Sequence, residues 1–130
     1  MSGQLLVRCE REWPWGMFVI DDAGLHAALP DWPDYEQLVG TDEAVLVPVM
    51  HAVDGPVVVE LWAGPAESGK GWSCVWDAPL SLPSGVARVG DAEWSMVAPS
   101  ALRAGTWRLR VLVDREQHSE HVRIVFTELG

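Results

Sequence analysis

Hydrophobic and polar residues alternate with a period of two over much of this chain. Within 106–114 every second residue from Trp107 onward is apolar, and arginines stand at two of the positions between them. Because side chains of a β-strand point alternately to its two faces, this pattern predicts a half-buried strand. The segment 122–127 alternates in the same way, and the polar residues 115–120 separate the two, so we expect an antiparallel hairpin here.

Other parts of the chain also have the pattern of strands. The segment 72–82 alternates, and Pro79 within it has no backbone N–H, so we expect this strand at a sheet edge or a bulge. The apolar runs 44–53 and 57–63 are joined by Asp54-Gly55-Pro56, and Asp-Gly is typical of a hairpin turn. Further strands are expected over 4–9, 16–21, 86–89 and 94–97.

One segment has the features of a short helix. In Asp31–Gly40 a proline stands near the start, carboxylates follow in the first turn, and a glycine closes the segment. The remaining pattern gives about seven to nine strands with turn residues between them. It predicts an all-β fold, which is an antiparallel β-sandwich or a flattened barrel with one short helix.

Size and composition predict a single β-sandwich domain over residues 1–130. Apolar residues make up 48% of the 130 residues, which is enough for a packed core. Two cysteines are too few for a disulfide framework, and the N-terminus lacks the long apolar run of a signal peptide. No stretch approaches the ~20 apolar residues of a membrane-spanning helix. We therefore expect a cytoplasmic protein without membrane contact, either a monomer or a homodimer.

The net charge of −10 comes from one block of the sequence. From Glu12 to Glu67 there are eleven carboxylates and no lysine or arginine, whereas acids and bases balance from Lys70 to the end. Such a field repels nucleic acid and raises association rates with basic proteins by roughly 10–10³ at low salt. We expect these carboxylates to gather into one surface patch that binds a basic protein and no nucleic acid.

Motifs that carry catalytic or metal chemistry are incomplete in this chain. Gly64–Gly71 matches G-x-x-x-x-G-K, but a phosphate-binding loop needs a following helix, and a strand is predicted from residue 72. His118 and His121 lie three residues apart without the further ligands of a zinc site. We therefore predict that the chain is not an enzyme and that it has no catalytic residues, no metal site and no cofactor.

Acidic and aromatic residues interleave between Asp31 and Glu43. Aromatic anchors provide desolvated contact energy, and carboxylates pair with arginine or lysine on a basic partner. The acidic pair at 21–22 adds to this set. The predicted partner-binding residues are Asp21, Asp22, Asp31, Trp32, Asp34, Tyr35, Glu36, Asp42 and Glu43. The alternative is that Trp32 and Leu38 hold a short helix on the sheet while the acids face solvent.

The order of these segments resembles the competence protein J family. The resemblance rests on the strand Met17–Asp22, the Asp-Trp-Pro-Asp segment at 31–34, and the closing segments 105–113 and 122–126 with a histidine-containing loop between them. Members of that family are small acidic β-rich proteins that act as partner and inhibitor of a DNA-entry nuclease. The resemblance implies a bacterial, cytoplasmic nuclease inhibitor or immunity-type protein whose acidic face imitates nucleic-acid phosphates at the nuclease cleft.

These observations together predict an acidic protein-binding module, an inhibitor or immunity-type partner of a basic nuclease or toxin. Two other hypotheses stay open. One is a carbohydrate- or small-ligand-binding β-sandwich, possibly hydrolytic, in which several of the eight tryptophans line a cleft. The other is a subunit of a homo-oligomer that pairs through the edge strand at 71–82.

Overall fold

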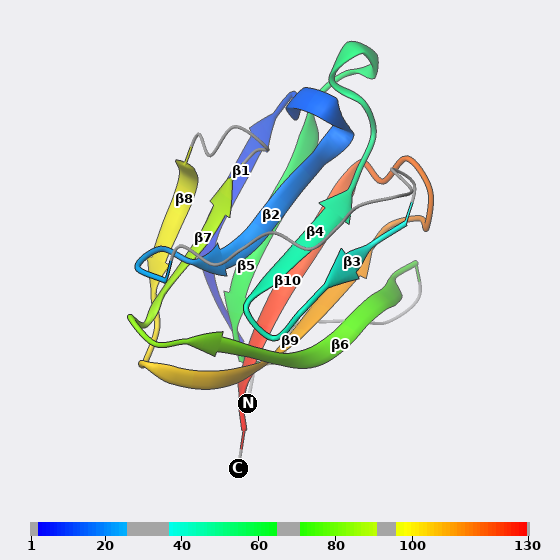
Figure 1. The fold of residues 1–130 in the computed structure, drawn as a ribbon. Helices are drawn as coiled ribbons and strands as arrows, with labels where there is room; N and C mark the ends of the chain where they lie inside the picture. Colours follow the sequence, from blue (N-terminus) through cyan, green and yellow to red (C-terminus); the bar gives the residue numbers. More distant parts are fainter. Residues whose placement is uncertain (1–2, 26–36, 65–70, 91–95, 130) are drawn as a thin grey trace.

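The structure is a computed structural model that describes residues 3–25, 37–64, 71–90 and 96–129. In this part of the chain ten strands form two five-stranded sheets that face each other (Figure 1). Sheet A has the order β1 (Gln4–Arg11), β5 (Val57–Ala63), β10 (His121–Glu128), β9 (Gly105–Val113) and β6 (Ser73–Leu82). Sheet B has the order β3 (Val39–Gly40), β4 (Ala44–Pro48), β2 (Met17–Asp22), β7 (Val86–Gly90) and β8 (Met96–Ala101).

The predicted all-β sandwich is confirmed, and the two sheets stay open at their edges instead of closing into a barrel. Neighbouring strands are antiparallel except β5 and β10, which run parallel. The predicted hairpin of β9 and β10 is present, and β6 lies at the edge of sheet A, with Pro79 opposite Arg108. The described residues hold ten strands, more than the expected seven to nine.

One prediction about a local element needs correction, and another falls mostly outside the described residues. The Asp-Gly-Pro turn does not make a hairpin, because β4 belongs to sheet B and β5 to sheet A. A short 3-10 turn, η2 (Ala52–Asp54), and Gly55 with φ of 128° carry the chain from one sheet to the other. Most of the expected helix at 31–40 lies outside the described residues, but its last two residues form β3 and are not helical.

Apolar side chains from both sheets fill the space between them. Trp13, Phe18 and Phe126 are completely buried, and the rings of Trp13 and Phe18 lie 5.2 Å apart, centroid to centroid. Along β9 the alternation predicted from the sequence holds, since Leu109 is buried while Arg108 on the other face is exposed. Burial of each large apolar side chain contributes about 1.5–3 kcal/mol to the stability of the sandwich.

The outer face of sheet A carries one buried carboxylate with a full set of partners. Glu60 accepts hydrogen bonds from the indole N–H of Trp62 at 2.7 Å and from Arg123 at 3.2 Å, and it also contacts the His121 ring. The Arg123 guanidinium stacks over the ring of Trp72 at 4.2 Å. Burial by itself would raise the pKa of Glu60, but the hydrogen bonds from Trp62 and His121 and the charge of Arg123 outweigh it and lower that pKa.

Glu60→Gln is expected to lower the free energy of unfolding by about 1–3 kcal/mol at neutral pH, because the charged hydrogen bonds of the carboxylate are lost. A carboxyl group with a lowered pKa in the folded state stabilises the protein above its ordinary pKa of 4.5. That stabilisation is lost as the pH falls through the folded-state pKa. Urea unfolding at neutral and acid pH checks this, and a difference between variant and parent that stays constant down to pH about 3 would contradict it.

Candidate functional site

The residues predicted to bind a partner fall into three groups along the chain. Asp31, Trp32, Asp34, Tyr35 and Glu36 lie outside the described residues. Asp21 and Asp22 end β2, and Asp42 and Glu43 precede β4. Because Asp21 pairs with Ala44 across β2 and β4, the structure brings these last two groups to the same end of sheet B.

The carboxylates of Asp21 and Asp22 are buried and satisfied within the fold. Asp21 accepts two hydrogen bonds from Arg88, at 2.8 and 2.7 Å. Asp22 accepts hydrogen bonds from the backbone N–H of Gly24 at 2.8 Å, from the backbone N–H of Ser84 at 2.9 Å and from its hydroxyl at 2.7 Å. Both side chains are completely inaccessible to solvent, so in this structure they hold the end of β2 and the next turn in place.

Asp42 and Glu43 form an exposed acidic turn. The Thr41 hydroxyl accepts hydrogen bonds from the backbone N–H groups of Glu43 at 3.1 Å and Ala44 at 3.2 Å, which fixes the turn. The carbonyl of Asp42 accepts a hydrogen bond from the N–H of Ser81 at 2.7 Å, which ties the turn to β6. The acidic turn therefore presents two carboxylates to solvent on a held backbone, and its role in partner binding stays a prediction.

The acidic block of the sequence is divided by the fold. Among its described carboxylates, three are buried, namely Asp21, Asp22 and Glu60. Four are exposed, namely Glu12, Asp42, Glu43 and Asp54. Glu12 shortly precedes η1 and Asp54 ends η2, at one end of the sandwich, whereas the acidic turn lies at the other end of β4. The described carboxylates thus do not form the single patch expected from the sequence.

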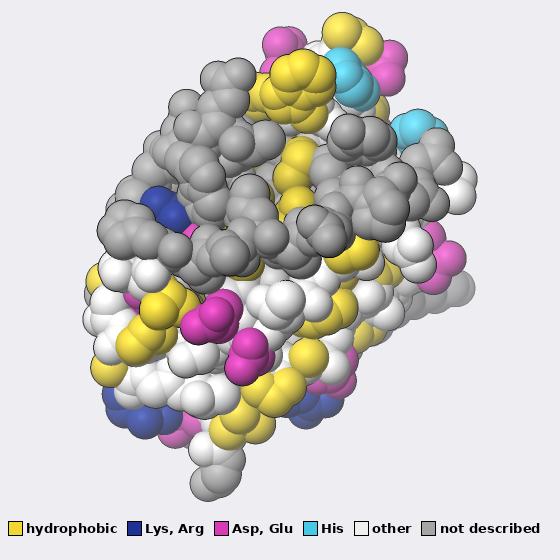
Figure 2. Space-filling view, in the orientation of Figure 1, with side chains coloured by type: hydrophobic (Ala, Val, Ile, Leu, Met, Phe, Trp, Pro, Cys, Tyr) yellow, Lys and Arg dark blue, Asp and Glu magenta, His cyan; other side chains and the backbone are white. Residues whose placement is uncertain are grey.

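The end of the sandwich opposite the acidic turn is formed by three loops and exposes large apolar side chains. Here η1 (Pro14–Gly16), η2 and the β9–β10 loop (114–120) come together, and we call this region the loop end. Trp13 is completely buried, but Trp15, two residues later, is 63% exposed, and Val53 in η2 is 84% exposed. Figure 2 shows hydrophobic, histidine and carboxylate side chains gathered at this end, at the top of the view.

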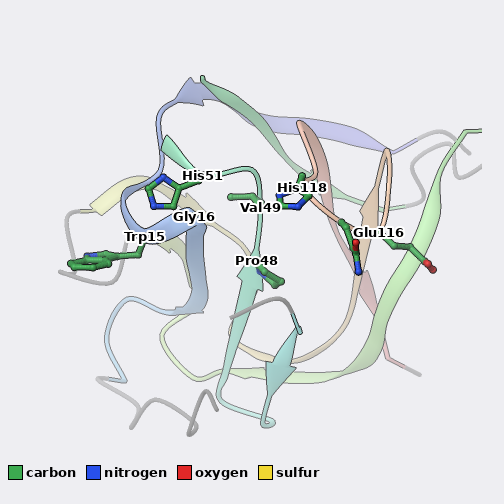
Figure 3. Close-up of a pocket in the computed structure, with 8 residues that line it drawn as sticks. Trp15, Gly16, Pro48, Val49, His51, Glu116 and His118 are labelled. Atoms are coloured by element: carbon green, nitrogen blue, oxygen red, sulfur yellow. The ribbon is translucent and has the colours of Figure 1, made fainter. Parts of the chain in front are cut away.

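A hollow of about 150 Å³ opens between the loops of the loop end. In Figure 3 Trp15 and His51 lie on one side of it, His118 and Glu116 lie on the other, and Pro48 and Val49 lie between them. Backbone hydrogen bonds connect the three loops around it: the N–H of Val49 donates to Gly16 at 2.8 Å, and the N–H of Met50 donates to Ser119 at 3.0 Å. Both sides of the hollow are therefore tied to the segment between them.

The backbone on both sides of the hollow is strained. Trp15 has φ of 64° and His118 has φ of 53°, and among the described residues these are the non-glycine residues with positive φ. Left-handed backbone costs a residue with a side chain on the order of 1–3 kcal/mol, and such strain is concentrated at functional sites. At Gly16, φ is 64° and a Cβ would lie 3.1 Å from the carbonyl oxygen of Val49, so the turn after Trp15 favours glycine.

The loop end presents several carboxylates to solvent. Glu12, Asp54 and Glu116 are exposed, and the residues that line the hollow include no lysine or arginine. The nearest cation of the β9–β10 loop, Arg115, donates to the carbonyl of His118 at 3.1 Å and pairs with Glu120. Its charge is therefore already matched within the loop.

The sequence pattern does not predict this surface. The run Trp13-Pro14-Trp15-Gly16 left open which indole is buried, because both tryptophans are equally apolar in a sequence pattern. The available signal was the pair Pro14 and Gly16, since proline and glycine flanking a tryptophan predict a turn. A tryptophan at the tip of a turn is more often exposed than one inside an alternating strand.

Two hollows in the described residues differ from the predicted ligand cleft with several indoles. The first holds Trp15 alone, and a second, of about 420 Å³ and lined by residues such as Leu38, Val47 and Val113, holds no tryptophan. The described residues also contain no group of three or more side chains that could hold a metal ion. None of the helical segments there is long and apolar enough to cross a membrane.

The fold places the chain among open, all-β sandwiches with two five-stranded sheets. Among solved structures it is similar to ComJ from Bacillus subtilis, an inhibitor of the DNA degrading activity of NucA, with a TM-score of 0.77 and 11% identity, over 99% of this chain and 100% of that one. It is also similar to the structure described as crocagin biosynthetic gene J, with a TM-score of 0.57 and 12% identity, over 100% of both chains. No family model and no curated protein matches the sequence. The predicted resemblance to the competence protein J family is thus confirmed as a likeness of fold.

Proposed function

We propose that this chain is a protein-binding module of the inhibitor type and that it binds a basic nuclease or toxin in the cytoplasm. The observation that carries the proposal is the loop end, where an indole that is 63% exposed stands on a strained turn beside a small hollow. Protein interfaces draw most of their binding energy from a few residues of this kind, and tryptophan is among the most enriched.

The net charge of the chain and the likeness of its fold both support a basic, DNA-degrading protein as the partner. The chain has a net charge of −10, and a field of this sign favours association with a basic protein. The similar protein ComJ is an inhibitor of the DNA degrading activity of NucA. In the proposed mechanism Trp15 is buried against the partner, the carboxylates around it steer the approach, and the bound module blocks access of DNA to the nuclease.

The acidic turn is proposed as a second contact region, together with the neighbouring segment Asp31–Glu36. The exposed carboxylates of Asp42 and Glu43 support this part of the proposal, and the acid and aromatic residues of 31–36 extend it in the sequence. Asp21 and Asp22 act there as supports of the fold, because their carboxylates are buried.

The proposal is tested by capturing binding proteins from the source cell and purifying each one. We expect a basic protein whose DNA-degrading activity falls to a small fraction when one equivalent of this chain is added. Its association rate is expected to fall by about tenfold or more as the salt concentration rises from low to physiological, because steering is electrostatic. Partners that are acidic, or nuclease activity that is unchanged in the complex, would count against the proposal.

A further inference from the structure

We infer that two copies of this chain pair through the free edge of β1 and form a symmetric dimer. In this dimer the two β1 strands run antiparallel across a twofold axis at Cys9, and the two copies of sheet A join into one continuous sheet. The inference goes beyond the proposed function and does not depend on it.

β1 is the edge strand of this sandwich with the least protection against a further strand. Each sheet has two edge strands, and the backbone N–H and C=O groups along a free edge can pair with any strand that lies beside it. Very short strands, prolines and bulges block such edges in many proteins. Among the other edge strands, β3 has two residues, β6 contains Pro79 and β8 contains Pro99. On β6 the N–H of Ser81 also already donates to the carbonyl of Asp42, whereas β1 has eight residues and no proline.

The second half of β1 is regular enough to pair with another strand. From Val7 to Arg11 each residue lies opposite one residue of β5, and the bulge of β1 lies before this stretch, between Leu5 and Val7. β8 of the other sheet comes near β1, but within the described part of the chain β5 is the one strand that pairs with it. The free side of Val7–Arg11 can therefore accept an antiparallel strand through main-chain hydrogen bonds.

Two opposite charges on this half of β1 have no partner among the described residues. Arg8 and Glu10 are exposed, and no hydrogen bond or ion pair joins either side chain to another described residue. They lie two positions apart and therefore point to the same face of the strand. Arg8 lies opposite Glu60 on β5, but the carboxylate of Glu60 is already bound by three other side chains of the outer face.

These two charges identify a second copy of the chain as the strand that fits. When Cys9 lies opposite Cys9 of the second copy, Arg8 of each copy lies opposite Glu10 of the other. Directly opposite residues of an antiparallel pair point to the same face, so two ion pairs form on the outer face of the joined sheet. A register shifted by two residues would instead place Arg8 opposite Arg8 or Glu10 opposite Glu10, which is unfavourable. The charge pattern is therefore complementary to itself in one register.

The charge of β1 also favours contact between two copies at this edge. Two chains that each carry a net charge of −10 repel one another over most of their surface. In β1 two arginines, Arg8 and Arg11, stand against one acid, Glu10, so its side chains sum to +1. The repulsion between two copies is thus smallest where their β1 strands meet.

The dimer leaves both loop ends accessible. β1 runs toward the loop end, because Trp13 and η1 follow it in the chain. Two antiparallel β1 strands therefore place the two loop ends at opposite ends of the dimer. Each copy can bind a protein partner there, so dimerisation and the proposed function are compatible.

Sedimentation velocity of the full chain at increasing concentration tests the inference. A short strand pairing without a large apolar interface predicts a dissociation constant on the order of 10–100 μM. Arg8→Glu and Glu10→Arg each place like charges opposite one another at two symmetric positions, and each is expected to weaken the dimer about tenfold or more. The double variant of Arg8→Glu with Glu10→Arg exchanges both charges and is expected to restore the dimer. All of these changes are at exposed positions, so the proteins are expected to stay folded, which circular dichroism checks.

A mixture of the two single variants separates strand pairing from general charge effects. Equal amounts of the Arg8→Glu and Glu10→Arg proteins are expected to form a heterodimer about as strong as the parent dimer, because opposite charges then face each other again. The control mixes Arg8→Glu with Glu43→Arg, which makes the same change of net charge at the acidic turn, and is expected to show no gain. A parent chain that stays monomeric up to about 1 mM, or single variants that dimerise like the parent, would overturn the inference. An equal gain in the two mixtures, or no gain in either, would also overturn it.

Discussion

Arg88→Met is expected to lower the free energy of unfolding by about 3–5 kcal/mol, because it leaves a buried carboxylate without its cation. Asp21 is completely buried, and the side chain of Arg88 is only 10% exposed. The two hydrogen bonds from Arg88 to Asp21, at 2.8 and 2.7 Å, join β7 to β2 in the middle of sheet B. The hydrogen bond to Asp21 also raises the pKa of Arg88, so this guanidinium stays charged in the fold.

The ion pair of Asp77 and Arg108 provides the matched control. It has similar geometry, with N–O distances of 2.8 and 2.6 Å, but its side chains are 41% and 47% exposed. Solvent screens an exposed ion pair, so Asp77→Asn is expected to leave the free energy of unfolding almost unchanged. Urea unfolding followed by tryptophan fluorescence measures both variants, and equal small losses would show that the buried pair is not a major support of sheet B.

Trp15→Ala is expected to weaken binding of the protein partner by about 30-fold or more, which corresponds to about 2 kcal/mol, the usual threshold of an interface hot spot. The large indole is 63% exposed in the isolated chain, so a partner can remove much apolar surface from water by covering it. The loss is expected mainly in the dissociation rate, as for most interface substitutions.

Two controls are needed to interpret a loss of binding by Trp15→Ala. One measures the stability of this variant, and the other removes charge at the acidic turn. Because the side chain is mostly exposed, the free energy of unfolding is expected to change by no more than about 0.5 kcal/mol. The double variant of Asp42→Asn with Glu43→Gln is expected to slow association at low salt and to change the dissociation rate little. Unchanged binding by a folded Trp15→Ala protein would exclude the loop end as the main contact surface.

Much of this fold could be predicted from the sequence, because the strands alternate clearly. The alternation in β9 and β10 and the polar residues between them identified a hairpin, and Pro79 identified an edge strand. The turn at 54–56 was misassigned for a physical reason. Turn residues indicate only the local backbone conformation. An Asp-Gly turn can therefore join two strands of one sheet in a hairpin, or connect a strand of one sheet to a strand of the other. Only the packing of β4 and β5 on different sides of the core distinguishes them.

Less of the candidate site could be predicted from the sequence, because the charge of a residue does not indicate whether its side chain is buried. The sequence pattern places Asp21 and Asp22 among the partner-binding residues, but the residues that hold their buried carboxylates, Arg88 and Ser84, lie more than sixty residues away in the chain. Trp13 and Trp15 read alike, yet one is in the core and the other is on the surface. In each case a contact that is distant in the sequence decides the role, and no local pattern contains it.

Amide hydrogen exchange of the chain, free and in complex with its basic protein partner, tests the central claim most directly. The claim is that the partner covers the loop end. Added protection is expected in the backbone around Trp15, at 49–54 in the segment that contains η2, and at 114–119, with the acidic turn protected less. Protection confined to the acidic turn or to the outer face of sheet A, with the loop end exchanging as in the free chain, would contradict the account.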